Sequence, residues 1–145
     1  MFLTKTMERD SIILGFRSDS FKHRKEGYRM PVIIVYGIPE GTNEDSLKIL
    51  SEKFIDITEN MEELGLKNGG VSVFFPADRM KWGLGEEIII MVEGLFEKLE
   101  RTIEVKKRLA RELVEATVKR FPAASLVECF VKSFDPNSGF FSSEI

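Results

Sequence analysis

The chain has 145 residues, of which 43% are hydrophobic, so it can form one globular domain with a buried core. Its formal net charge is −3, and its single cysteine, Cys129, excludes an intramolecular disulfide and fits a reducing compartment. No apolar run is long enough to cross a bilayer, and the acidic balance argues against a broad nucleic-acid-binding face. We therefore expect a cytoplasmic protein that binds neither membranes nor nucleic acid.

Residues 1–29 differ in charge from the remainder of the chain. They hold seven Lys/Arg and four Asp/Glu, a net charge of +3, whereas residues 31–145 carry −6. Their short apolar stretch is followed by basic residues and does not resemble a secretory signal. We expect an N-terminal extension at 1–29, as a disordered leader or an upstream mis-start, and one domain at 30–145. A tail that contacts something acidic is the alternative.

The dipeptide Met30-Pro31 is typical of the start of a protein. Removal of an initiating Met30 would leave Pro31 with a free secondary amine, whereas inside a chain its nitrogen is an amide without basicity. Codons for Lys25, Glu26 and Gly27 can also encode a bacterial ribosome-binding sequence a few nucleotides upstream. We therefore expect the native polypeptide to begin at Pro31. The alternative is an ordinary proline at the first residue of a strand.

The first half of the domain predicts a strand, a helix and a second strand. An apolar strand covers residues 32–38, and Thr42 followed by Asp45 has capping-box spacing, which predicts a helix start. Apolar residues then recur at three- and four-residue steps, which indicates an amphipathic helix of about five turns. These residues are Leu47, Leu50, Phe54, Ile57, Met61 and Leu64. A second strand follows at residues 71–75.

The second half repeats this order. A strand at residues 88–92 continues toward Phe96, Thr102 is the expected N-cap of a helix, and a last strand covers residues 126–131. The helix has an apolar stripe of Val105, Leu109, Leu113 and Ala116. Two strand–helix–strand units predict an α+β fold: duplicated βαβ units forming a four-stranded sheet, with both helices on one face. The strands are apolar without alternation, so the far face should be apolar too and covered by self-association, or in part by residues 1–29.

This pattern resembles the tautomerase superfamily, and in particular its long, internally duplicated members. These include relatives of 4-oxalocrotonate tautomerase, macrophage migration inhibitory factor and the hydroxymuconate isomerases. Residues 71–83 resemble the second strand and proline turn of that family, and residues 133–141 are similar to its last strand and C-terminal hairpin. The resemblance covers residues 30–143. It implies a homotrimer that joins its sheets, with active sites between subunits.

The resemblance also implies a cofactor-independent isomerase that acts on a small enolisable keto acid. The Pro31 nitrogen would act as general base, or as acid when protonated. A free terminal amine titrates near about 8, and an apolar pocket lowers that pKa toward the working pH. Val32, Phe130 and the pair Phe140-Phe141 would line the pocket. Neighbouring proline-dependent chemistries are hydration, dehalogenation and decarboxylation, and a non-enzymatic trimer with a blocked proline is the other alternative.

The expected substrate is anionic, and lysines are the candidate partners for its carboxylate. The resemblance places Lys67 in the pocket, and Lys132 of the last strand could enter the pocket of a neighbouring subunit. Glu93, near the end of the third strand, could polarise a water molecule or relay a proton. The family's arginine pair is replaced by Thr42 and Ser72, which argues against a dicarboxylate.

Other catalytic chemistries find little support in the sequence. The only histidine, His23, lies in the extension, which argues against serine–histidine catalysis and a histidine-rich metal site, so we expect no cofactor and no metal. Arg79, Lys81 and Trp82 form a basic, aromatic turn that could bind an anion. The alternative is that Trp82 packs over a subunit joint and the two cations are solvated.

Overall fold

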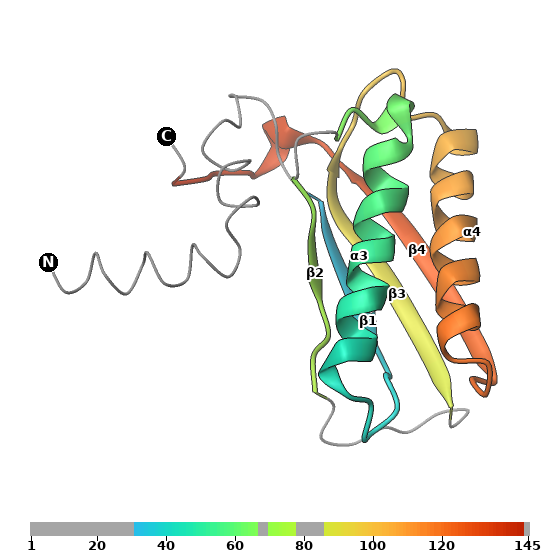
Figure 1. Cartoon of the computed structure of the whole chain (residues 1–145). Coiled ribbons are helices and arrows are strands. Elements are labelled where there is room, and N and C mark those ends of the chain that lie inside the picture. The colour runs from blue at the N-terminus through green and yellow to red at the C-terminus, as the bar shows by residue number, and fades with distance from the viewer. Residues whose placement is uncertain (1–30, 67–69, 78–85, 144–145) are drawn as a thin grey trace, which may run out of the picture.

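The computed structural model describes residues 31–66, 70–77 and 86–143, and the predicted extension 1–29 lies outside them (Figure 1). The elements in chain order are β1 (Val32–Tyr36), α3 (Glu44–Asn60), the 3₁₀ turn η1 (Glu62–Leu64), β2 (Ser72–Phe74), β3 (Glu87–Phe96), α4 (Ile103–Arg120), β4 (Leu126–Phe134) and the 3₁₀ turn η2 (Pro136–Ser138). None of the helices in these described segments is both long and apolar enough to span a membrane.

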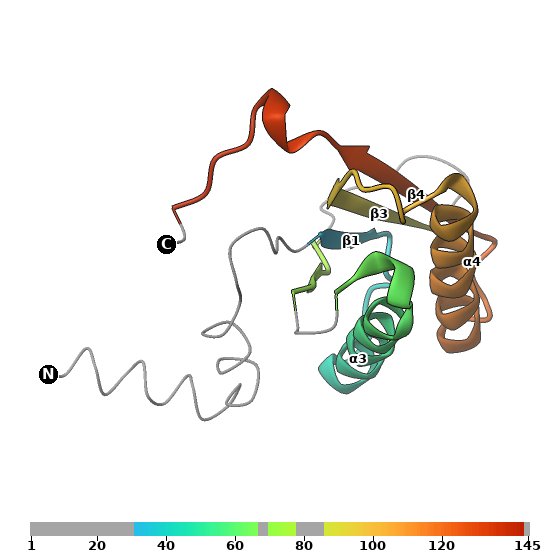
Figure 2. The same ribbon diagram turned by 90° about the horizontal axis from the view of Figure 1, so that it is seen from above.

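The four strands form one sheet in the order β2-β1-β3-β4. β1 pairs in parallel with β2, and β3 pairs in parallel with β4, so each strand–helix–strand unit supplies one parallel pair. The two units meet where β1 pairs antiparallel with β3. Figure 2 shows α3 and α4 on the same face of this sheet. The predicted α+β architecture of two βαβ units is confirmed.

The core lies between the sheet and the two helices. Alternate strand residues point into it and, with Leu95 after the bulge in β3, six strand residues are at most 1% exposed: Ile33, Val35, Ile88, Ile90, Val92 and Leu95. The helices contribute Leu50, Phe54, Leu109 and Leu113, which are also buried. Burial of these apolar side chains stabilises the fold by roughly 1.5–3 kcal/mol each. The strand residues that alternate with these point to the far face of the sheet, away from the helices.

The start of α3 differs from the predicted one. The N-cap is Asn43, whose side-chain oxygen accepts a hydrogen bond of 2.8 Å from the Ser46 N–H. Thr42 instead donates its hydroxyl to the Pro39 carbonyl at 2.7 Å, and so closes the preceding turn. Asparagine is as good a cap as threonine or better, which explains the shift by one residue.

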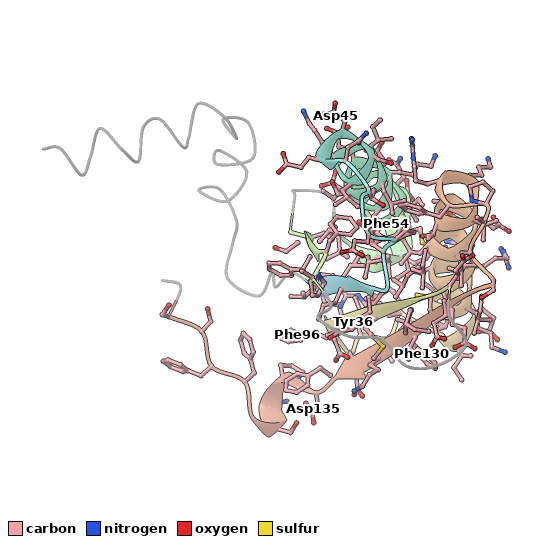
Figure 3. The ribbon with its side chains drawn as sticks, turned by 90° about the horizontal axis from the view of Figure 1, so that it is seen from below. Tyr36, Asp45, Phe54, Phe96, Phe130 and Asp135 are labelled. Carbon is pink, nitrogen blue, oxygen red and sulfur yellow. The ribbon has the colours of Figure 1, made fainter. Side chains whose placement is uncertain are left out.

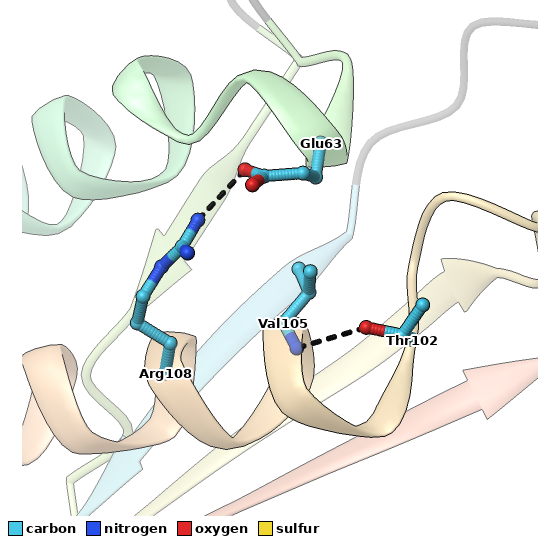
Figure 4. A network of polar contacts seen from close by, with 4 residues as sticks. All are labelled: Glu63, Thr102, Val105 and Arg108. Atoms are coloured by element: carbon cyan, nitrogen blue, oxygen red, sulfur yellow. Dashed lines mark hydrogen bonds and ion pairs between the residues drawn. The ribbon is translucent and has the colours of Figure 1, made fainter.

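The predicted start of α4 is confirmed, since the Thr102 side chain accepts from the Val105 N–H at 3.2 Å (Figure 4). On the next turn, Arg108 pairs with Glu63 of η1 at 2.7 Å between Nη2 and Oε1. A backbone hydrogen bond and, to a smaller extent, this hydrogen bond from Arg108 lower the pKa of the Glu63 carboxyl. The pair joins the start of α4 to the turn after α3.

Several element ends also differ from those predicted. The first strand stops at Tyr36 rather than residue 38, because Gly37 adopts a φ of 87° and turns the chain. The α3 helix ends at Asn60, so Met61 and Leu64 are buried outside it. Gly65 then takes the left-handed conformation. The β2 strand has three residues rather than five, while β4 extends three residues beyond the predicted end, to Phe134.

Candidate functional site

Pro31 is buried directly before β1, at the end of the sheet where β1 begins and β3 ends. Its carbonyl accepts a hydrogen bond of 3.4 Å from the Ser72 N–H of β2. The peptide after Pro31 is thereby held in the sheet, while the pyrrolidine ring stands directly before the strand. Within the described residues, the ring is therefore placed by strand pairing.

Glu93 and Lys132 lie beside this strand start. Glu93 is the cross-strand partner of Val32, the residue after Pro31. A register shift between Val92 and Leu95, with Gly94 at a φ of 77°, marks a bulge at this point of β3. Lys132 Nζ lies 3.7 Å from Glu93 Oε1, and the two side chains are 62% and 37% exposed. The pair therefore offers to solvent a carboxylate on β3, the strand next to β1, and an ammonium on β4, one strand further away.

Phe130, the first of the aromatic residues predicted to line the pocket, belongs to β4. Phe130 pairs with Met91, which pairs with Ile34, so Phe130 lies two strands from β1 on the far face. Figure 3 shows Phe130 and Tyr36 on the side of the sheet away from Phe54. Phe130 is about half exposed.

The segment after β4 leads away from the sheet, as Figures 1 and 2 both show. Phe140 packs edge-on against Phe96, with ring centroids 5.0 Å apart. Phe141 is 91% exposed.

Lys67 lies outside the described residues, as do Arg79, Lys81 and Trp82. In the part of the chain that the structure describes, no three His, Cys, Asp or Glu side chains form a group that could hold a metal ion.

Arg101 is a buried cation that the sequence analysis did not identify. Its Nε and Nη2 donate to the Leu64 carbonyl at 3.2 and 2.6 Å, and its Nη1 donates to the Phe96 carbonyl. Burial lowers the pKa of this guanidinium. Arg101 thus links the turn after α3 to the end of β3. Arg101 directly precedes the N-cap Thr102. An exposed arginine at this position would look the same in the sequence, so the sequence does not indicate this buried role.

Comparison with known proteins shows which of them share this arrangement of strands and helices. No family model matches the sequence, and no curated protein matches it. Solved structures do. A fused 4-OT, described as a wild-type symmetric trimer, is 17% identical, with 79% of this chain and 94% of that chain covered and a TM-score of 0.61.

Macrophage migration inhibitory factor from Toxoplasma gondii is 12% identical, with 79% of this chain and 98% of that chain covered and a TM-score of 0.57. A protein inactivated by 2-oxo-3-pentynoate is 17% identical, with 79% and 93% covered and a TM-score of 0.61.

The chain shares the fold of these 4-OT and macrophage migration inhibitory factor structures. The expected resemblance is confirmed at the level of the fold alone. Identities of this size do not show which residues carry out a function. The shared fold comprises the two βαβ units, and Pro31 directly precedes its first strand.

Proposed function

We propose that this protein is a cofactor-independent tautomerase whose base is the nitrogen of Pro31, freed by removal of Met30. The observation that carries the proposal is the place of Pro31 directly before β1 in a fold shared with tautomerase structures. As a terminal secondary amine it would take a proton from carbon of a small enolisable keto acid. It would then return that proton to the other end of the enol system.

Pro31 is buried in the 145-residue chain, and the proposal requires that an apolar surrounding also covers the freed amine. A low-dielectric surrounding disfavours the ammonium form and lowers an amine's pKa, which keeps more of the base ready at neutral pH. Lys132, 3.7 Å from Glu93, is the described cation closest in register to Pro31, and we assign it to the substrate carboxylate. Lys67 is the second proposed partner. An ammonium at the carboxylate also stabilises the enolate as its charge develops.

We further propose that the active protein is a homotrimer that joins its sheets. Large apolar side chains on the far face are partly exposed, including Tyr36 at 41% and Phe130 at 49%. One of the structural neighbours is described as a symmetric trimer. In such an assembly Phe130 and Phe141 of one chain would line the pocket of another, which the single chain leaves incomplete.

The test compares a protein beginning at Pro31 with the 145-residue form. We expect the first to interconvert keto and enol forms of phenylpyruvate, and the second to be slower by about 10²–10⁴-fold, the usual value of general base catalysis. Equal rates would refute the mechanism, since an amide nitrogen cannot accept the proton. The mass of the protein isolated from its own host shows which form occurs naturally.

A covalent probe tests the nitrogen directly. 2-Oxo-3-pentynoate, which inactivated one structural neighbour, carries a triple bond conjugated to its ketone. The Pro31 amine would add to the alkyne carbon remote from the ketone. An N–C bond forms, one π bond breaks, and the amine proton moves to the adjacent carbon, so the protein gains the whole mass of the reagent. We expect this adduct on the Pro31 peptide of the short form only.

The second candidate function is a non-enzymatic domain of the same fold. It is favoured by the 30 residues that precede Pro31 in the printed sequence, which make its nitrogen an amide. This function would be supported if the natural protein retains those residues and if neither the 145-residue form nor the form beginning at Pro31 is active.

A further inference from the structure

A cavity of about 330 Å³ lies at the end of the sheet opposite Pro31. Gly37, which follows the last residue of β1, is part of its lining, together with Pro39, Glu86, Ile88 and residues 120–124. Pro31 precedes the first residue of the same strand, so the two places are about 20 Å apart along the chain direction. The cavity is therefore separate from the candidate site.

Most of the cavity wall is apolar and held by hydrogen bonds. Ile88 is a core residue, and Phe121 to Ala124 form the turn between α4 and β4. The Phe121 N–H donates to the Thr117 carbonyl at 2.8 Å, and the Ala124 N–H donates to the Phe121 carbonyl at 3.1 Å. On the other side, the Ser125 N–H donates to the Glu86 carbonyl at 2.7 Å. These bonds keep the wall in place without a ligand, as is usual for small-molecule sites.

Positive charge collects beside this apolar wall. Arg120 lines the cavity and also the neighbouring groove between α3 and α4, where Lys53 and Lys119 join it. Across the described segments, none of these three cations forms an ion pair. Glu86 is the one carboxylate among the cavity-lining residues. The carbonyl end of α4 favours cations, but Lys119 and Arg120 in its last turn offset that dipole.

We propose that this cavity binds a small carboxylate with an apolar body, such as a phenylalkanoate or a branched-chain acid. The apolar body would fill the space against Ile88 and Phe121, and the carboxylate would meet the Arg120 guanidinium. A planar guanidinium can hold a carboxylate through two parallel hydrogen bonds, which a single lysine cannot. The volume is at the lower end of the range of about 300–1,000 Å³ for ligand sites, which fits one ring with a short chain. The inference does not depend on the chemistry of Pro31.

The test uses the 145-residue chain and three probes of one shape: 3-phenylpropanoate, 3-phenylpropanamide and 3-phenylpropylamine. We expect saturable binding of the carboxylate in calorimetry, about tenfold or more weaker binding of the amide, and no binding of the amine. Amide NMR shifts should map to Glu86, Ala123 and Ala124. Arg120→Gln should weaken carboxylate binding by about tenfold or more, whereas Arg111→Gln, an exposed arginine of the same helix outside the cavity, should not.

Ala123→Trp is the second variant, because it fills the exposed mouth of the cavity and should abolish binding without removing charge. Any one of four results would overturn the proposal. The first three are no saturable binding at millimolar probe, equal binding of the carboxylate and the amine, and NMR shifts confined to the residues around Pro31. The fourth is that Arg120→Gln and Ala123→Trp both bind the carboxylate as the parent protein does.

Discussion

At the scale of single residues, Cys129 illustrates how position decides reactivity. It is a half-buried residue of β4 that packs against the core, and burial raises the pKa of its thiol to about 12. The thiolate is the reactive form, so the folded protein should hardly react with iodoacetamide at neutral pH, whereas the urea-unfolded chain should react at the normal rate. Mass spectrometry measures the extent of modification over time. Fast modification of the folded protein would contradict the expected protection of the thiol.

The same shift has a consequence for stability at alkaline pH. The unfolded thiol has a pKa of about 9 and the folded one about 12, so the unfolded chain loses its proton first as pH rises. The contribution of Cys129 is therefore complete below pH 9 and is lost between pH 9 and 12. Urea unfolding curves above pH 9 should show a smaller loss of stability with pH in Cys129→Ala than in the parent protein.

Lys132 carries the residue-scale prediction for the candidate site. In the form beginning at Pro31, Lys132→Ala should lower kcat/KM for an anionic substrate by about tenfold or more, chiefly through KM, because it removes a charged partner of the carboxylate. Lys107→Ala, an exposed lysine of α4, is the matched control. If Lys132→Ala and Lys67→Ala both leave kcat/KM unchanged, neither lysine holds the substrate.

At the scale of elements, the start of α3 depends on Asn43. Its side chain satisfies the Ser46 N–H, which has no partner inside the helix. Asn43→Ala should therefore lower the free energy of unfolding by about 1 kcal/mol, as removal of a cap usually does. Asn43→Asp keeps the acceptor and should cost little. Chemical denaturation measures both, and equal losses would show that the cap hydrogen bond does not stabilise the helix.

At the scale of the whole molecule, the far face of the sheet governs association. Phe130 lies in the row Ile34, Met91, Phe130 of that face. In the proposed homotrimer this row is buried, so Phe130→Glu should yield monomers in light scattering, because a buried unpaired carboxylate is costly. Val118→Glu is the matched control, since Val118 is exposed to a similar degree on α4. A monomeric parent protein, or a trimeric Phe130→Glu, would refute the assembly.

How far prediction from sequence succeeds depends on whether a feature is local. Strand and helix periodicity and the Thr102 cap follow from neighbouring residues, and they were predicted. The cap at Asn43 and the early end of β1 at Tyr36 were missed, because adjacent turn-forming residues compete for the same roles. The bulge at Gly94 was missed because it arises from pairing with β4, which local pattern does not contain.

The sequence by itself determined the duplicated βαβ architecture and singled out Pro31, because apolar periodicity and the Met30-Pro31 dipeptide are written along the chain. Tertiary structure alone decided that Glu93 and Lys132 meet beside the start of β1, since three strands distant in sequence must pair in one register. It alone decided that Arg101 is buried against two carbonyls, and that Arg120 borders an apolar cavity. Such contacts join residues far apart in the chain, and only the packed sheet and helices bring them together.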